Sequence, residues 1–158
     1  MKRAQQILIC LLATAGLLLA ACDTAAPEVA SSAYTPVTAE GIQGVIVPAA
    51  LAEEFDLSEQ YWTPSEEDVM KLEAALPAYL EQVGESELAA RLPEYMRQYV
   101  GFSFDGDRLL YANFFCNPYD IDWQKEAVFI LDGGNCYFQV QFSPEEEQFL
   151  YLQINGES

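Results

Sequence analysis

The chain has 158 residues and no histidine, and its 25 acidic residues outnumber its 7 basic residues to give a net charge of -18. Without histidine there is no Ser-His-Asp or Cys-His catalytic pair, and zinc lacks its commonest nitrogen ligand. A charge this negative repels nucleic-acid phosphates and anionic lipid headgroups, so we expect neither as a direct ligand. Such an acidic surface indicates a well-solvated domain, with attraction of a cationic partner or of calcium as the alternative.

The N-terminus has the pattern of an export signal. Lys2 and Arg3 precede an apolar stretch over residues 7–19, which is too short to span a bilayer comfortably. Residues 19–22 read Leu-Ala-Ala-Cys and resemble the lipobox of bacterial lipoproteins. The resemblance implies cleavage before Cys22, acylation of that cysteine, and a lipid-anchored place on the outer side of a cell membrane, in the periplasm or at the cell surface. An ordinary signal-peptidase site and an uncleaved membrane helix are the alternatives.

On this interpretation the chain divides into a signal peptide (residues 1–21), a lipidated cysteine with a flexible tether (22–40) and one globular domain (41–158). The tether is rich in Ala, Thr, Ser and Pro and has neither helical nor strand periodicity. Two or more acyl chains on Cys22 anchor a protein stably, whereas one chain is marginal. Residues 41–57 are more apolar and predict either a short strand or a segment packed on the domain.

Two amphipathic helices are expected next. The first has Thr63 as N-cap and Glu66 completing a capping box, is kinked at Pro77, and ends at Gly84. A second helical pattern covers residues 88–99. Each pattern contains a Leu-Pro pair, which fits either an old duplication or two unrelated short helices of common composition.

After residue 99 the period of the apolar residues changes to two. Five strands are expected, over residues 100–104, 108–116, 127–131, 136–142 and 149–154. The order of elements predicts an α+β fold, with one or two N-terminal helices packed on a four- to five-stranded antiparallel meander. This order resembles the cystatin-like and nuclear-transport-factor-like families. Residues 61–68 and 131–138 resemble sequence segments of small uncharacterised secreted bacterial proteins. Neither this resemblance nor the resemblance to the two fold families implies an activity.

Two cysteines, Cys116 and Cys136, remain once Cys10 is removed with the signal peptide and Cys22 is lipidated. They do not form a Cys-x-x-Cys redox motif, and an export compartment favours their pairing as a disulfide. The expected meander opposes this pairing, because Cys116 ends the second strand at one edge and Cys136 begins the fourth strand at the other. The pairing therefore depends on whether the intervening loop interrupts the meander.

The last two expected strands indicate a candidate ligand face. Side-chain alternation predicts that Leu150 points into the core and that Phe149 points to the opposite face of the sheet. The residues of the candidate face lie on that same opposite face and are Tyr137, Gln139, Gln141, Tyr151 and Gln153. Flat rings among neutral amides suit glycans or peptides. The ordinary alternative is that aromatic residues are good strand formers whose area is half buried by neighbours.

Carboxylate pairs are the remaining catalytic candidates, because a glycosidase needs only two acids, one of them with a raised pKa. Asp105 and Asp107 lie in an expected turn, where such residues are common in any case, and Asp120 and Asp122 lie in a loop. The segment that begins at Asp120 has Lys125 where an EF-hand requires glycine, so no metal site is predicted.

These observations predict a lipid-anchored accessory or binding protein without a cofactor. Its membrane contact is the lipid on Cys22, and its partner is a glycan, a peptide or a protein. A cell-wall glycan hydrolase that uses an acid pair is the alternative function.

Overall fold

The computed structural model describes residues 33–156, so the lipobox, Cys22 and most of the expected tether lie outside the described residues. The elements in chain order are β1 (Thr35–Pro36), β2 (Gln43–Val47), η1 (Ala49–Phe55), β3 (Tyr61–Trp62), α1 (Glu66–Val83), α2 (Ser86–Arg91), η2 (Leu92–Glu94), β4 (Met96–Phe104), β5 (Asp107–Phe115), η3 (Gly134–Cys136), β6 (Tyr137–Ser143) and β7 (Gln148–Ile154), where η denotes a 3₁₀ helix. This part of the chain is α+β. None of its helices combines the length and the apolar character that a membrane span requires.

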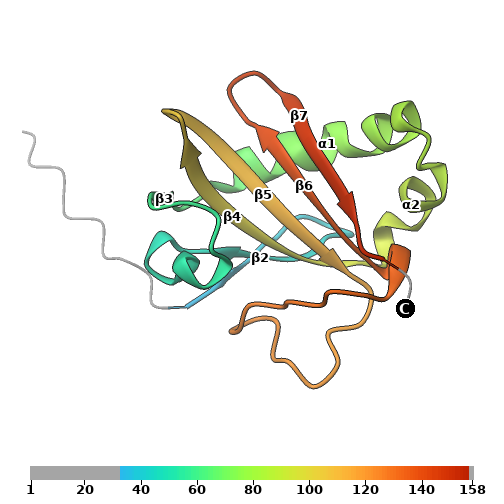
Figure 1. The fold of residues 1–158 in the computed structure, drawn as a ribbon, viewed down its shortest axis with the longest axis horizontal. Helices are drawn as coiled ribbons and strands as arrows, with labels where there is room; N and C mark the ends of the chain where they lie inside the picture. The colour runs from blue at the N-terminus through green and yellow to red at the C-terminus, as the bar shows by residue number, and fades with distance from the viewer. Residues whose placement is uncertain (1–32, 157–158) are drawn as a thin grey trace, which may run out of the picture.

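One mostly antiparallel sheet of seven strands organises these residues. The strand order is β1-β2-β4-β5-β6-β7, and β3 pairs with β4 outside this path. Strands β4 to β7 form an antiparallel meander, whereas β2 pairs with β4 in parallel through a crossover that contains α1 and α2. Figure 1 shows α1 on one side of the sheet, behind β5, β6 and β7.

The expectation that the helices come first is wrong, because three strands precede α1. The first strand, β1, falls inside the expected tether, and its neighbours Tyr34 and Val37 are buried. Of residues 41–57, Gln43–Val47 form β2 and Ala49–Phe55 form η1. Strands β1 and β3 have two residues each, which is too short for an apolar period to show in the sequence.

Helix α1 begins two residues later than expected. Ser65, not Thr63, is the N-cap, and it forms the capping box with Asp68. The Ser65 side chain accepts a hydrogen bond from the backbone N–H of Asp68, and the Asp68 carboxylate accepts one from the N–H of Ser65. The helix continues through Pro77 and ends at Gly84, whose φ of 93° is a left-handed conformation suited to glycine.

The second expected helix, over residues 88–99, is largely wrong. Helix α2 ends at Arg91, a short turn containing Pro93 follows, and β4 begins at Met96. Tyr95 and Tyr99 are four residues apart. This spacing puts two side chains on one face of a helix and also on one face of a strand, so it does not distinguish the two structures. The two Leu-Pro segments therefore have different structures.

The third expected strand, over residues 127–131, does not form. Strand β6 pairs directly with β5, with Phe115 opposite Tyr137. The residues between these strands form a long connection, which Figure 1 shows below the sheet. We call residues 117–133 the covering loop, because they pack on the sheet face opposite α1 through Val128 and Trp123.

The core has a layer on each face of the sheet. Helices α1 and α2 cover one face, where Leu72, Leu76 and Leu80 pack against Phe138 and its neighbours. The other face is covered by η1 in one part and by the covering loop in another. The sheet is therefore not one-sided, and only part of its second face is open.

Strand β7 contains a bulge that changes the expected alternation. Gln141 pairs with Tyr151 and Phe142 pairs with Phe149, which leaves Leu150 as the extra residue. Phe149 therefore packs toward α1, with its ring 4.3 Å from that of Tyr79. Leu150 is 50% exposed, so the prediction that it is buried is wrong.

Candidate functional site

A row of amide side chains crosses the sheet on the face opposite α1. Gln98, Asn113, Gln139 and Gln153 lie on the neighbouring strands β4 to β7 and are in register with one another. Gln98 and Asn113 are buried, Gln139 is half-buried and Gln153 is exposed. Buried amides need hydrogen-bond partners, and the buried half of this row finds them in the covering loop.

The amide row holds the covering loop by its backbone. Gln98 Nε2 donates to the carbonyls of Trp123 (2.8 Å) and Glu126 (2.7 Å), and Gln98 Oε1 accepts from the N–H of Val128 (3.0 Å). Asn113 Nδ2 donates to the Val128 carbonyl at 2.8 Å. These side chains provide the bonds that a neighbouring strand would otherwise provide, which explains how a loop without strand geometry covers the sheet.

Tyr137 is the one residue of the candidate face that the loop covers completely. Its side chain is 3% exposed, and its hydroxyl donates to the carbonyl of Asn117 at 2.8 Å. Burial raises the pKa of Tyr137 to about 12. The prediction that Tyr137 is accessible to solvent is therefore wrong, and this ring belongs to the core under the loop.

The other four residues of the candidate face remain at the surface. Gln139 and Gln141 are half-buried, and Tyr151 (43% exposed) and Gln153 are exposed. The Tyr151 hydroxyl donates to Gln153 Oε1 at 2.5 Å. The helices lie on the opposite face and do not cover these side chains.

A recess of about 160 Å³ lies where the open part of this face meets the covering loop. The loop contributes one wall, whose residues Phe129 and Leu131 are 53% and 93% exposed. The recess is lined by rings, amides and aliphatic groups, which are Tyr111, Asn113, Val128, Phe129, Ile130, Leu131, Tyr137, Gln139, Gln153 and Asn155. Apart from the two tyrosines, none of these lining side chains titrates.

The lining of the recess is polar but carries no charged side chain. Burial raises the pKa of both Tyr111 and Tyr137, so their hydroxyls stay protonated and neutral at physiological pH. Gln139 Nε2 lies within hydrogen-bond distance of Asn113 Oδ1 (3.4 Å) and Asn155 Oδ1 (3.3 Å), and Asn155 Nδ2 donates to the Ile130 carbonyl. The lining thus offers fixed neutral dipoles and ring surface rather than a nucleophile or a general base.

Cys116 and Cys136 form a disulfide, with their Cα atoms 5.2 Å apart. The pairing is possible because the third expected strand is absent, which makes β5 and β6 direct neighbours with the cysteines flanking the Phe115–Tyr137 pair. The Cys116 N–H also donates to the Cys136 carbonyl at 3.0 Å. The disulfide closes the ends of the covering loop and so fixes one wall of the recess.

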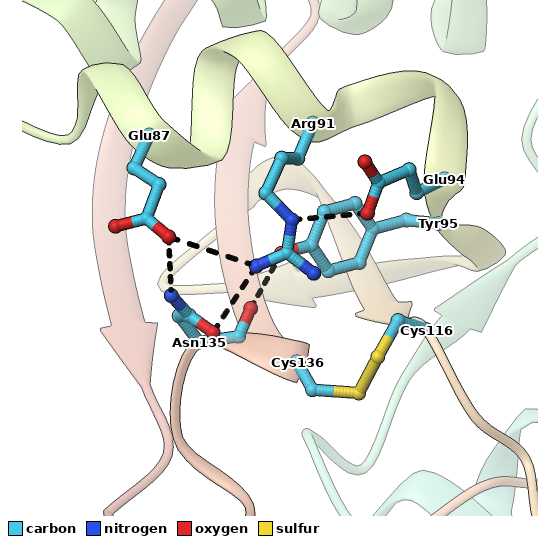
Figure 2. Close-up of polar contacts among 7 residues, drawn as sticks. All are labelled: Glu87, Arg91, Glu94, Tyr95, Cys116, Asn135 and Cys136. Atoms are coloured by element: carbon cyan, nitrogen blue, oxygen red, sulfur yellow. Dashed lines mark hydrogen bonds and ion pairs between the residues drawn. A yellow bond between two sulfur atoms is a disulfide. The ribbon is translucent and has the colours of Figure 1, made fainter.

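A polar cluster next to the disulfide attaches α2 to η3, which follows the covering loop (Figure 2). Arg91 pairs with Glu94 at 3.0 Å and donates to Asn135 Oδ1 at 3.3 Å. Asn135 also receives a hydrogen bond at its carbonyl from the Tyr95 hydroxyl and donates to Glu87. Every group in this cluster is engaged by another, which indicates a structural role.

The two carboxylate pairs lie at opposite ends of β5. Asp105 lies in the exposed turn before β5 and Asp107 is the first residue of that strand, whereas Asp120 and Asp122 lie beyond its other end. Lys125 hydrogen-bonds Asp122 at 2.7 Å and lowers the pKa of that carboxyl. A glycosidase acid requires the opposite direction of shift.

Comparisons with protein-family models, with curated proteins and with solved structures found no match to this chain.

Proposed function

We propose that the protein is a lipid-anchored binding protein on the outer side of a cell membrane and that the recess beside the covering loop holds its ligand. The observation that carries the binding role is the exposure of Phe129 and Leu131 on the recess wall, opposite a row of neutral amides. Large apolar side chains exposed beside polar groups of fixed orientation are typical of ligand sites.

The size and chemistry of the recess favour one compact group of a larger ligand. A volume of about 160 Å³ admits one sugar ring or one peptide side chain rather than a cofactor. Flat rings stack on the apolar face of such a group, while amides exchange hydrogen bonds with its polar atoms. The ligand we propose is therefore a glycan or a peptide that inserts one residue.

A melting-temperature screen of the chain from residue 23 onward tests this role. Muropeptides, simple oligosaccharides and short peptides are added separately, because a ligand that binds only the native state raises the melting temperature. Tyr151→Ala and Leu131→Ser should weaken any ligand found and leave the melting temperature of the free protein within a few degrees, because both side chains are exposed. A ligand that both variants bind as well as the parent does would place the site elsewhere.

The lipid anchor needs its own test. Cys22→Ser should yield an unprocessed precursor without lipid, because the lipobox resemblance makes Cys22 both the acylated residue and the first residue after the cut. The measurements are the intact mass and the distribution between membrane and soluble fractions. A variant that matures to the parent's mass and stays on membranes would contradict lipidation at this residue.

The acid-pair hydrolase is the less favoured function. It predicts that the chain from residue 23 onward clears a peptidoglycan suspension and that Asp120→Asn or Asp122→Asn abolishes the clearing. The Asp122–Lys125 pair and the exposure of both aspartates argue against such activity.

A further inference from the structure

We propose that the free edge of β7 binds an extended segment of a partner protein, one that is apolar at alternate positions and basic at its ends. This surface is separate from the recess, so the inference does not rest on the proposed function. It follows from the backbone of β7, from the hollows beside it and from the charges at its two ends.

Within residues 33–156, strand β7 ends the strand order of the sheet and has a strand partner on one side only. Its seven residues, Gln148–Ile154, contain no charged residue and no proline, and none of them is fully buried. Strands at sheet edges are usually shortened, charged, bulged or interrupted by proline, because their unpaired backbone groups attract other strands, and of these features β7 has only the bulge at Leu150. The opposite edge has this protection: β1 has two residues, and one of them is Pro36.

The direction of the unpaired groups on β7 follows from one hydrogen bond. The Asn155 N–H donates to the Tyr137 carbonyl at 3.0 Å, so the backbone of Asn155 faces β6. Because this direction alternates along a strand, the N–H and C=O groups of Leu152 and Ile154 point to the free edge. Just beyond them, Asp132 of the covering loop already pairs with Gly156, in parallel.

The side of this edge that faces α1 has room for the side chains of an added strand. Two adjoining hollows of about 460 and 360 Å³ lie between α1 and the β6–β7 hairpin, and both include Ala75 and Glu147 in their walls. Small residues of α1, Ala74 and Ala78, complete their apolar floor with Met70. An added strand would direct every second side chain into these hollows.

The charges at the two ends of β7 indicate whether a second copy of the chain or a different partner binds this edge. Acidic residues lie at both ends of the edge: residues 145–147 are three consecutive glutamates before β7, and Asp132 lies beside Gly156 after it. Antiparallel pairing of two β7 edges would bring the glutamates of each copy near Asp132 of the other. Like charges so placed repel, whereas lysine or arginine at the ends of a partner segment is attracted.

The test uses the full chain in a mild detergent and a fluorescent peptide of about ten residues, in which Val and Thr alternate between two lysines at each end. Anisotropy should report saturable binding that weakens as salt is added. A peptide with glutamates in place of the lysines should bind at least about tenfold more weakly, which corresponds to about 1.4 kcal/mol. A lysine peptide methylated on alternate backbone nitrogens should also lose binding, since it lacks the donors that pair with β7.

A matched pair of variants separates strand pairing from general attraction to an acidic protein. Leu152→Ala and Leu152→Pro both shorten the side chain, but only the proline removes the N–H at the free edge, a position where edge strands tolerate proline. The proline variant should bind the lysine peptide at least about tenfold more weakly than the alanine variant. Equal binding by the two variants would overturn the proposal.

Two further measurements keep the test decisive if Leu152→Pro unfolds. Glu146→Gln with Glu147→Gln should weaken the lysine peptide severalfold and reduce the salt dependence, while Leu131→Ser in the recess wall should change neither. No effect of the glutamine substitutions would contradict the assigned surface. Dimerisation of the peptide-free protein that Leu150→Lys abolishes would show that a second copy is the occupant, and would overturn the proposal of a different partner.

Discussion

Arg97 is a cation buried in the core, and its contacts attach α1 to β4. Its Nε lies 3.0 Å from Glu73 Oε1, in an ion pair rather than a well-aligned hydrogen bond, and both side chains are almost completely buried. Its other two nitrogens donate to the carbonyls of Tyr95 (2.7 Å) and Leu92 (2.8 Å). The Tyr99 hydroxyl donates to the same Glu73 oxygen at 2.6 Å. One arginine thus connects a helix, a turn and a strand.

Glu73→Leu should lower the free energy of unfolding by about 3 to 5 kcal/mol, because it leaves the Arg97 charge buried without its partner. Tyr99→Phe should cost less, about 1.5 to 3 kcal/mol, since it removes one hydrogen bond to a charged group and keeps the ion pair. The measurement is urea unfolding at neutral pH. Adding Arg97→Met to Glu73→Leu should recover much of the loss, and a double variant no more stable than the single one would contradict this account.

Glu66 connects the first turn of α1 to the segment between β1 and β2. The Thr38 hydroxyl and backbone N–H donate to Glu66 Oε1 at 2.5 and 3.0 Å, and these bonds lower the pKa of the Glu66 carboxyl. A carboxyl whose pKa is lower in the folded state stabilises the protein above its unfolded pKa, about 4.3 for glutamate. This contribution is lost as the pH falls through the lower, folded pKa.

Thr38→Val should raise the pKa of Glu66 part of the way to its ordinary value, because it removes the hydroxyl bond and keeps the backbone N–H. An NMR titration of the side-chain carboxyl carbons measures the midpoint directly. Thr35→Val, a change at an exposed threonine of β1 without a hydrogen bond to Glu66, is the control and should leave the midpoint unchanged. An unchanged midpoint in Thr38→Val would assign the shift to another cause.

At the level of elements, the strongest sequence patterns located α1 and the hairpin strands. The apolar period of two in residues 137–142 correctly separated the core-facing phenylalanines of β6 from its glutamines. The pairing of β2 with β4 was not predictable, because parallel partners far apart in sequence leave no local signal. The burial of Tyr137 was not predictable either, because it depends on where the covering loop lies.

The covering loop could not be predicted because its support comes from side chains rather than from a strand. Residues 127–131 are apolar enough to resemble a buried strand, yet their backbone bonds go to Gln98, Asn113 and Asn155. A buried amide on a strand has no periodic signature that distinguishes it from a solvated one. For the same reason, the sequence did not show that the covering loop covers one part of the predicted ligand face and leaves the other part open.

Gln98→Met should destabilise the covering loop more than a similar change at the open end of the same amide row. The substitution keeps most of the side-chain volume but leaves the Val128 N–H and two loop carbonyls without partners, at a cost of about 2 to 3 kcal/mol. Gln153→Met should change the stability by less than about 0.5 kcal/mol, because its side chain is exposed. Hydrogen exchange at Val128 should accelerate only in the first variant, and equal protection in both would contradict this role of Gln98.

For the molecule as a whole, negative charge is the dominant surface property. Each basic side chain between residues 33 and 156 has a carboxylate within ion-pair distance, and these side chains are Lys71, Arg91, Arg97, Arg108 and Lys125. The 22 acidic side chains in this range outnumber its 5 basic ones, so most of the carboxylates there have no basic partner. An uncompensated surface of this kind favours basic partners and opposes self-association, in agreement with the occupant proposed for β7.

Salt should raise the melting temperature of the chain from residue 23 onward, although salt usually weakens ion pairs. Exposed ion pairs contribute only about 0 to 1 kcal/mol each, so their screening costs little. The repulsion among the excess carboxylates acts over the whole surface, and it is screened as the Debye length falls from about 30 Å at 0.01 M to about 10 Å at 0.1 M. Melting curves recorded across this range at neutral pH measure the balance. The same series at a pH close to 4.1, the pI of the full sequence, is the control, because many carboxylates are protonated there and the rise should be much smaller. A melting temperature that falls with salt at neutral pH would mean that the ion pairs outweigh the repulsion.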